Sequence, residues 1–176
     1  MFKIKNLAFC GLLIALATVT SFIKIFSFPF GGSVTLLSML FVVLAGYFYG
    51  PKLGILTAIV YGLLQLVIEP QIYYPMQVLM DYILAFGVLG TAGFFYKLFG
   101  KKNYAIAVSG AIVTFLRYVC HILSGLLIWG VYAPEGQSVW AYSVIYNGTY
   151  MVPEIIITVI CLTVITPFLS KSKNQL

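Results

Sequence analysis

Six strongly apolar stretches follow one another along this chain, and short polar loops separate them. The expected helices cover residues 6–23, 35–50, 53–68, 78–97, 104–131 and 143–168. A helix of about 20 apolar residues crosses the hydrocarbon core of a bilayer. The pattern therefore predicts an all-α polytopic membrane protein, in which a bundle of six transmembrane helices forms a single domain over residues 1–176.

Lysine residues fall almost entirely on one side of this predicted bundle. Lys24 lies on the other side, and Arg117 lies inside the fifth stretch. The eight remaining basic residues are Lys3, Lys5, Lys52, Lys97, Lys101, Lys102, Lys171 and Lys173. Cytoplasmic loops of membrane proteins are enriched in Lys and Arg. Both termini are therefore expected in the cytoplasm, with the bundle in the plasma membrane.

Composition narrows the class of function. The chain is 62% hydrophobic and 8% charged, whereas a soluble domain carries about 25% charged residues. Six spans leave no room for a soluble catalytic domain in 176 residues. The net charge of +6 comes from lysines in loops and at the ends, so it indicates a lipid bilayer as surroundings and predicts no nucleic-acid partner.

Motifs for covalent or metal chemistry are absent from the sequence. It contains neither His-Glu-x-x-His nor Gly-x-Ser-x-Gly, and it has a single histidine. It also lacks the Gly-x-x-x-x-Gly-Lys-[Ser/Thr] loop that cradles nucleotide phosphates. We therefore expect no enzyme, no metal site and no cofactor in this chain, although an intramembrane hydrolase is an alternative to be weighed.

Aromatic residues are distributed unevenly between the two sides. Both tryptophans, Trp129 and Trp140, fall on the outer side, with many of the tyrosines. An interfacial belt of Trp and Tyr should occur on both faces of the membrane. The asymmetry favours an aromatic site that faces outward.

Charged residues inside the apolar stretches need an explanation, because burying one costs about 2.5–3.5 kcal/mol on insertion scales. Arg117 and Glu154 both lie near the middle of their helices, so we predict a structural ion pair between the fifth and sixth. Asp81 lies near the outer start of the fourth helix. There it is either a solvated group that favours the helix dipole or part of a site.

Several dissimilar polar and aromatic groups are expected in the outer half of the membrane. They are Asp81, His121, Trp129, Tyr142 and Asn147. Aromatic faces attract cations, and a carboxylate supplies charge or a strong acceptor. This set suits a small organic cation with hydrogen-bonding ring nitrogens.

Three segments of this outer region carry a family resemblance. They are His121–Trp129, Tyr132–Tyr142 and Tyr146–Met151, and the likeness extends to Gln77–Phe86 and Tyr61–Leu64. These segments resemble ThiT, the thiamine-specific S component of energy-coupling-factor (ECF) transporters. The resemblance implies an S-component fold and a high-affinity thiamine site that opens outward.

The resemblance also implies particular site residues. The matched positions are Asp81, Tyr82, His121, Trp129, Tyr142, Asn147 and Tyr61, with Tyr146 as a further candidate. A tyrosine of the third loop contributes in the family, and both Tyr73 and Tyr74 are candidates. Tyr61 and Asp81 stand where family members can carry Trp and Glu, which alters stacking area and reach. The first outer loop is a lid in the family, which would give Phe28 and Phe30 that role.

The same resemblance implies that the chain has partner subunits. S components dock through small residues of helix one onto a transmembrane scaffold subunit, and the nearest match here is Gly11-x-x-x-Ala15. Two separate ATPase subunits would use the ATP. The implied function is thiamine capture for an ABC-type importer. Alternatives are an S component for another vitamin or precursor, such as an aminopyrimidine, and a structural or channel-like bundle without transport.

Overall fold

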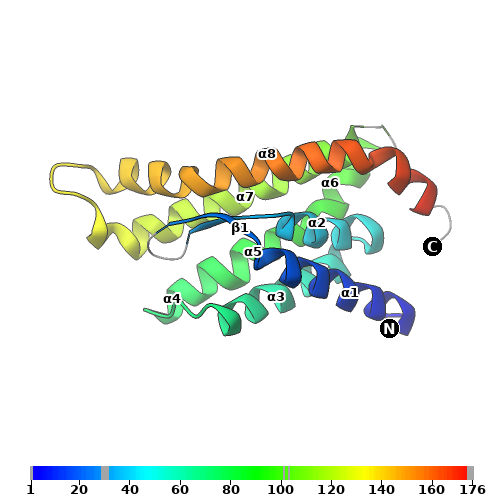
Figure 1. Cartoon of the computed structure of the whole chain (residues 1–176), viewed down its shortest axis with the longest axis horizontal. Helices are drawn as coiled ribbons and strands as arrows, with labels where there is room; N and C mark the ends of the chain where they lie inside the picture. The colour runs from blue at the N-terminus through cyan, green and yellow to red at the C-terminus, as the bar shows by residue number, and fades with distance from the viewer. Residues whose placement is uncertain (1, 29–31, 101, 103, 174–176) are drawn as a thin grey trace.

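The computed structural model describes residues 2–28, 32–100, 102 and 104–173. Its helices lie roughly along one long axis, and both chain ends lie at the same end of the molecule (Figure 1). The rods are α1 (Ile4–Ser21), α2 (Ser38–Tyr49), α3 (Pro51–Ile68), a composite rod Pro75–Phe99, α7 (Ala105–Leu127) and α8 (Val139–Lys173). The predicted all-helical membrane fold is confirmed.

Helix α2 differs from the other rods in length. Within the described residues, five helices are long and apolar enough to cross a membrane, but α2 has only 12 residues. At 1.5 Å per residue it extends about 18 Å, which is short of a hydrocarbon core of about 30 Å. It is nevertheless almost completely buried. Helix α2 is therefore a buried core element, and a different structural element occupies the rest of its path across the bundle.

That other structure is a β-hairpin that the hydropathy pattern did not predict. Strand β1 (Lys24–Ser27) pairs antiparallel with β2 (Ser33–Thr35). We expected helix from residue 35, but α2 begins at Ser38, after Leu37 adopts a left-handed conformation with φ of 67°. Strand β2 therefore continues the path of α2 outward, and the hairpin lies between α8 and the α1–α3 side of the bundle (Figure 1).

The fourth rod departs twice from α-helical pitch. It consists of α4 (Pro75–Val78), the π-helical turn η2 (Leu79–Leu84), α5 (Ala85–Gly87), the 3₁₀ turn η3 (Val88–Thr91) and α6 (Ala92–Phe99). Short π-helical turns inside α-helices are rare and frequently mark functional sites. Asp81 and Tyr82 both lie in η2.

Helix α8 is longer than expected. It runs without interruption from Val139 to Lys173 and includes Pro153 and Pro167. We had placed its end at residue 168, near Pro167. Its main partner is α7, and the loop between these two helices, which contains the 3₁₀ turn η4 (Trp129–Tyr132), projects at the end of the molecule opposite the termini (Figure 1).

Glycines allow α2, α3 and the fourth rod to approach closely. A Cβ atom on Gly54 would lie 2.5 Å from Gly46 Cα and would also meet the carbonyl oxygen of Gly90. Small residues at such crossings let membrane helices pack backbone to backbone. The crossing fixes the fourth rod, and with it η2, against α3.

We expect Gly54→Ala to destabilise the protein by about 1–3 kcal/mol, because the new methyl group meets backbone atoms that cannot move aside. Thermal unfolding of the detergent-purified protein measures this. Gly11→Ala is the matched control, since a Cβ at Gly11 has nothing within 4 Å. Equal unfolding temperatures for the two variants would contradict the close crossing.

Candidate functional site

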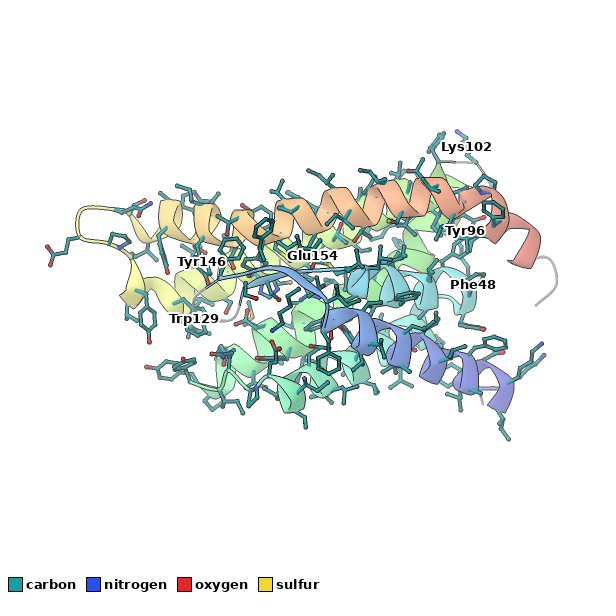
Figure 2. All side chains as sticks on the ribbon, viewed as in Figure 1. Phe48, Tyr96, Lys102, Trp129, Tyr146 and Glu154 are labelled. Atoms are coloured by element: carbon teal, nitrogen blue, oxygen red, sulfur yellow. The ribbon has the colours of Figure 1, made fainter. Side chains whose placement is uncertain are left out.

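A cavity of about 150 Å³ lies between the hairpin, the fourth rod, α3, α7 and α8. Trp129 and Tyr146, two of its lining residues, lie toward the end of the molecule opposite the termini (Figure 2). Other lining residues that the argument uses are Thr35, Tyr61, Asp81, Tyr82, Phe86, Arg117, His121, Tyr142, Asn147, Tyr150 and Glu154. The cavity therefore collects groups from both halves of the chain.

Among the carboxylates that line the cavity, Asp81 accepts the largest number of hydrogen bonds from protein donors. Its Oδ1 lies 3.0 Å from His121 Nδ1, and its Oδ2 accepts from Ser124 Oγ at 2.9 Å and from Trp129 Nε1 at 3.3 Å. Its side chain is 14% exposed. Three donors around a buried carboxylate favour the charged form. Asp81 thus lines the cavity, and it is too buried to be the solvated helix cap that was the alternative.

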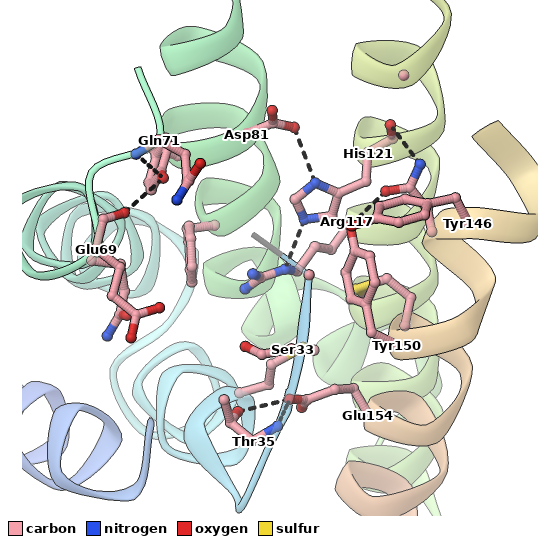
Figure 3. Close-up of a pocket in the computed structure, with 18 of the residues that line it drawn as sticks. Ser33, Thr35, Glu69, Gln71, Asp81, Arg117, His121, Tyr146, Tyr150 and Glu154 are labelled. Atoms are coloured by element: carbon pink, nitrogen blue, oxygen red, sulfur yellow. Dashed lines mark hydrogen bonds and ion pairs between the residues drawn. The ribbon is translucent and has the colours of Figure 1, made fainter. Parts of the chain in front are cut away.

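His121 links Asp81 to Arg117 (Figure 3). The Arg117 Nε–H group donates to His121 Nε2 at 3.3 Å. Arginine can only donate, so Nε2 accepts, and the ring proton resides on Nδ1, where it is donated to Asp81. The imidazole is therefore held as a neutral bridge between a cation and an anion, and its orientation is fixed at both nitrogens.

Arg117 also stacks on an aromatic ring. Its guanidinium carbon lies 3.8 Å from the centroid of the Phe86 ring. A cation over an aromatic face in a desolvated site gains about 2 kcal/mol. Phe86 in turn packs edge-on against Tyr61, with ring centroids 5.2 Å apart. The cation at the inner part of the cavity is thus stabilised by a ring and an imidazole.

Arg117 and Glu154 do not form the predicted ion pair as a direct contact, although their opposite charges still interact across the cavity. Within the described residues, neither ion pair of the protein joins these two side chains. Glu154 Oε1 instead accepts from the Thr35 backbone N–H at 2.5 Å and from Thr35 Oγ1 at 2.7 Å. The reason is the hairpin, which brings Thr35 donors to the carboxylate while Phe86 and His121 engage the guanidinium. Both side chains still line one cavity.

Asn147 is held by hydrogen bonds at both ends of its amide. Its Nδ2 donates to the Ser143 carbonyl oxygen at 2.8 Å and lies 3.3 Å from the His121 carbonyl oxygen. Its Oδ1 accepts from Tyr150 Oη at 2.5 Å. The amide therefore ties α7 to α8 and positions the Tyr150 ring, which lies 5.9 Å from the His121 ring.

Aromatic rings cover the outer part of the cavity. Trp129 packs edge-on against Tyr73, with centroids 4.9 Å apart. Tyr142 and Tyr146 are stacked, with centroids 5.7 Å apart and an interplanar angle of 27°. These rings come from η4, α8 and the loop before α4. They provide flat faces of the kind that an aromatic cation requires.

Tyr82 closes the cavity toward α3. Its hydroxyl donates to the Glu69 carbonyl oxygen at 3.1 Å and accepts from the Gln71 N–H at 3.2 Å. Glu69 also forms an ion pair with Lys24 of β1. Sequence reasoning missed Glu69 and Gln71 as lining residues, together with Gln65, Gln77, Phe86 and Tyr150. The four polar residues of this group lie close to the ends of the apolar stretches that form the third and fourth helices. That position is the sequence signal that could have identified them.

The structure brings most of the predicted ligand-binding residues together. The cavity is lined by Asp81, Tyr82, His121, Trp129, Tyr142, Asn147, Tyr61 and Tyr146. Tyr74 is 58% exposed and is not among the lining residues, whereas Tyr73 contacts Trp129. Of the two lid candidates, Phe28 lies 6.5 Å from Tyr150, ring to ring. Phe30 lies outside the described residues, as does Lys101 of the set of lysines predicted to be cytoplasmic.

Comparisons with known proteins point to one family. The sequence model of the family described as "Thiamine transporter protein (Thia_YuaJ)" matches residues 7–174. The chain is 39% identical over 159 residues to "Thiamine transporter ThiT" of Bacillus subtilis, covering 83% of this chain and 82% of that protein. It is 31% identical over 119 residues to the protein of the same name from Lacticaseibacillus paracasei, covering 60% and 59%.

A solved structure agrees with the fold. The structure of ThiT from Listeria monocytogenes superposes with a TM-score of 0.81 at 24% identity and covers 96% of each chain. At that identity the likeness concerns the fold, and it extends over nearly the whole chain. The family match, the identity to the curated relatives and the fold agree, and the chain belongs to the thiamine transporter protein (Thia_YuaJ) family.

Proposed function

We propose that this protein is the thiamine-binding S component of an ECF-type importer, and that it captures thiamine from outside the cell. The observation that carries the proposal is the Asp81 carboxylate, which three donors keep charged at 14% exposure in a cavity walled by aromatic rings. Thiamine combines a thiazolium cation with a flat aminopyrimidine. Such a ligand matches a buried anion beside aromatic faces.

Membership of a transporter family gives the chain a transport function and no enzymatic one. Together with the apolar helices, it makes the chain a multi-pass protein of the plasma membrane. The competing hypothesis of an intramembrane hydrolase is set aside for the same reason. A structural bundle without a ligand does not account for a cavity lined by two buried carboxylates, one guanidinium and several tyrosines.

The residues of the cavity would have different roles in ligand binding. Asp81 would supply the counter-charge for the thiazolium ring, and Trp129, Tyr142 and Tyr146 would supply stacking faces. His121 and Asn147 are fixed by their own hydrogen bonds. They act as rigid walls that hold Asp81 and Tyr150 in place, which reduces the entropy lost when a ligand binds.

Titration of the detergent-purified protein with thiamine tests the proposal. We expect saturable one-to-one quenching of tryptophan fluorescence, confirmed by calorimetry. In a Trp140→Phe variant the signal should persist, because Trp129 lines the cavity whereas Trp140 is 58% exposed. An aminopyrimidine without the thiazolium cation is the comparison ligand. Tighter binding of that fragment would move the function to an aminopyrimidine precursor, and binding of neither would reject the proposal.

Energy for uptake would come from partner subunits, namely a transmembrane scaffold and two ATPases. Support for docking through helix one comes from its surface. Gly11 and Ala15 are both exposed, and a Cβ at Gly11 has nothing within 4 Å. Two exposed small residues four positions apart give a partner helix a flat place to approach.

We expect Gly11→Leu to leave thiamine binding unchanged and to lower thiamine uptake at least tenfold, because the larger side chain keeps a partner helix at a distance. Binding is measured by the titration and uptake by accumulation of labelled thiamine in cells that contain the partner subunits. Gly11→Ala is the control that should transport normally. Normal uptake by Gly11→Leu would exclude this face as the docking surface.

A further inference from the structure

The β-hairpin is both a wall of the cavity and a connection between two sides of the bundle. Gly32, Ser33 and Thr35 line the cavity, and a Cβ on Gly32 would meet the Tyr150 ring at 2.6 Å. The hairpin therefore lies directly over the groups that the proposed function uses. Any movement of its second strand would change access to the cavity.

The two strands are attached in different ways. Strand β1 is attached at the rim, where Lys24 forms an ion pair with Glu69, and their side chains are 30% and 46% exposed. Exposed pairs of this kind contribute about 0–1 kcal/mol. Strand β2 is attached in the interior, where Thr35 is 8% exposed and Glu154 is 2% exposed. The buried attachment is the one that can fix the hairpin.

That buried attachment is a two-pronged clamp (Figure 3). Both the backbone N–H and the hydroxyl of Thr35 donate to the single oxygen Oε1 of Glu154, at 2.5 and 2.7 Å. The Thr35 hydroxyl oxygen also lies 2.5 Å from Ser38 Oγ in the first turn of α2. Hydrogen bonds to a carboxylate are among the stronger ones in proteins. The clamp joins α8, β2 and α2 at one point beneath the cavity.

We infer that Glu154 is a positioning residue, which holds strand β2 in place as the wall of the cavity and so sets how fast a bound ligand leaves. The inference rests on the proposed function for the identity of the ligand, but the clamp itself is tested without any ligand. It goes beyond the predicted role of Glu154 as the partner of Arg117. The Glu154 carboxylate offers one acceptor oxygen to two donors of strand β2, which gives a charged group at mid-membrane depth a structural role.

Hydrogen exchange of the protein without added thiamine is the first test, read on peptides that cover residues 32–37. In Glu154→Met, which keeps the length of the side chain but removes its acceptor, exchange of these peptides should be at least tenfold faster. Thr35→Val removes the hydroxyl and keeps the backbone N–H, so its effect should be smaller and in the same direction. Glu154→Gln keeps an oxygen acceptor and should restore protection.

The matched control is Thr158→Val. Thr158 lies one helical turn beyond Glu154 on α8 and is 1% exposed, and its Oγ1 has no hydrogen-bond partner among the described residues. This substitution changes the same helix at similar burial without touching the clamp. Exchange in residues 32–37 should equal that of the unchanged protein. A general loosening of α8 would instead accelerate exchange in both Thr158→Val and Glu154→Met.

Stopped-flow measurement of thiamine binding is the second test. We expect the dissociation rate to rise about tenfold in Glu154→Met and less in Thr35→Val, with an association rate that is unchanged or higher. A merely structural defect would lower the binding-competent fraction and leave the dissociation rate unaltered. Unchanged exchange in residues 32–37, or faster exchange with an unchanged dissociation rate, would overturn the inference. Failure of the unchanged protein to bind thiamine would reject the proposed function, while the exchange data would still decide the clamp.

Discussion

Asp81→Asn should weaken thiamine binding about 30-fold to several thousand-fold, without loss of the fold. Removing one member of a buried charge pair costs about 2–5 kcal/mol, and each 1.4 kcal/mol is about a factor of ten in affinity. The substitution keeps the size of the side chain and an oxygen that can still accept from His121 or Trp129. It removes the negative charge that would face the thiazolium ring, together with one of the two oxygens that accept hydrogen bonds in the unchanged protein.

Calorimetric titration measures this loss, and thermal unfolding verifies that the variant folds. Glu69→Gln is the matched control, because Glu69 also lines the cavity but is paired with Lys24 at the exposed rim. Its effect should stay within about threefold, as expected for an exposed pair. Equal affinity of Asp81→Asn and the unchanged protein would remove Asp81 from the ligand site.

Trp129→Ala should weaken thiamine binding about 30-fold or more, because truncation of a central aromatic contact costs about 2 kcal/mol or more. The indole contributes twice, since its face covers the cavity beside Tyr73 and its N–H donates to Asp81 Oδ2 at 3.3 Å. Trp129→Phe keeps one aromatic ring but loses the N–H donor and the smaller ring of the indole. A net hydrogen bond contributes about 0.5–1.5 kcal/mol, so loss of the donor alone should weaken binding about 2- to 12-fold, and the smaller ring adds to this loss.

The same titration compares these variants with Trp140→Ala. Trp140 is the other tryptophan of the chain, and at 58% exposure it does not line the cavity. Its replacement should leave the affinity unchanged. Normal binding by Trp129→Ala, or an equal loss in Trp140→Ala, would reject the stacking role.

Much of the site could be predicted from the sequence because it lies on long helices with strong apolar patterns. Asp81, His121 and Asn147 are polar residues within such stretches, and each lines the cavity. Which groups they bond could not be predicted. Arg117 and Glu154 illustrate this, because similar depth in neighbouring helices indicated an ion pair, whereas Phe86, His121 and Thr35 are their actual partners.

Residues at the rim were harder to predict for a different reason. Glu69 and Gln71 lie where an apolar stretch ends, so their polarity is equally consistent with a solvated loop. They line the cavity because the Tyr82 hydroxyl bonds to both of their backbones. Only the packing of η2 against the end of α3 reveals that arrangement.

The sequence by itself determined the membrane class, the number and approximate positions of the helical rods, and the polar residues that the bilayer makes costly. Hydrophobic periodicity and length carry that information, because each rod must satisfy its own backbone within the apolar core. Only the tertiary structure decided three features, namely the β-hairpin, the π-helical turn that contains Asp81, and the Thr35–Glu154 clamp. The clamp joins residues 119 apart in the chain, and the hairpin and the π-helical turn pack against the distant helices α8 and α7. No local pattern of polarity encodes such contacts.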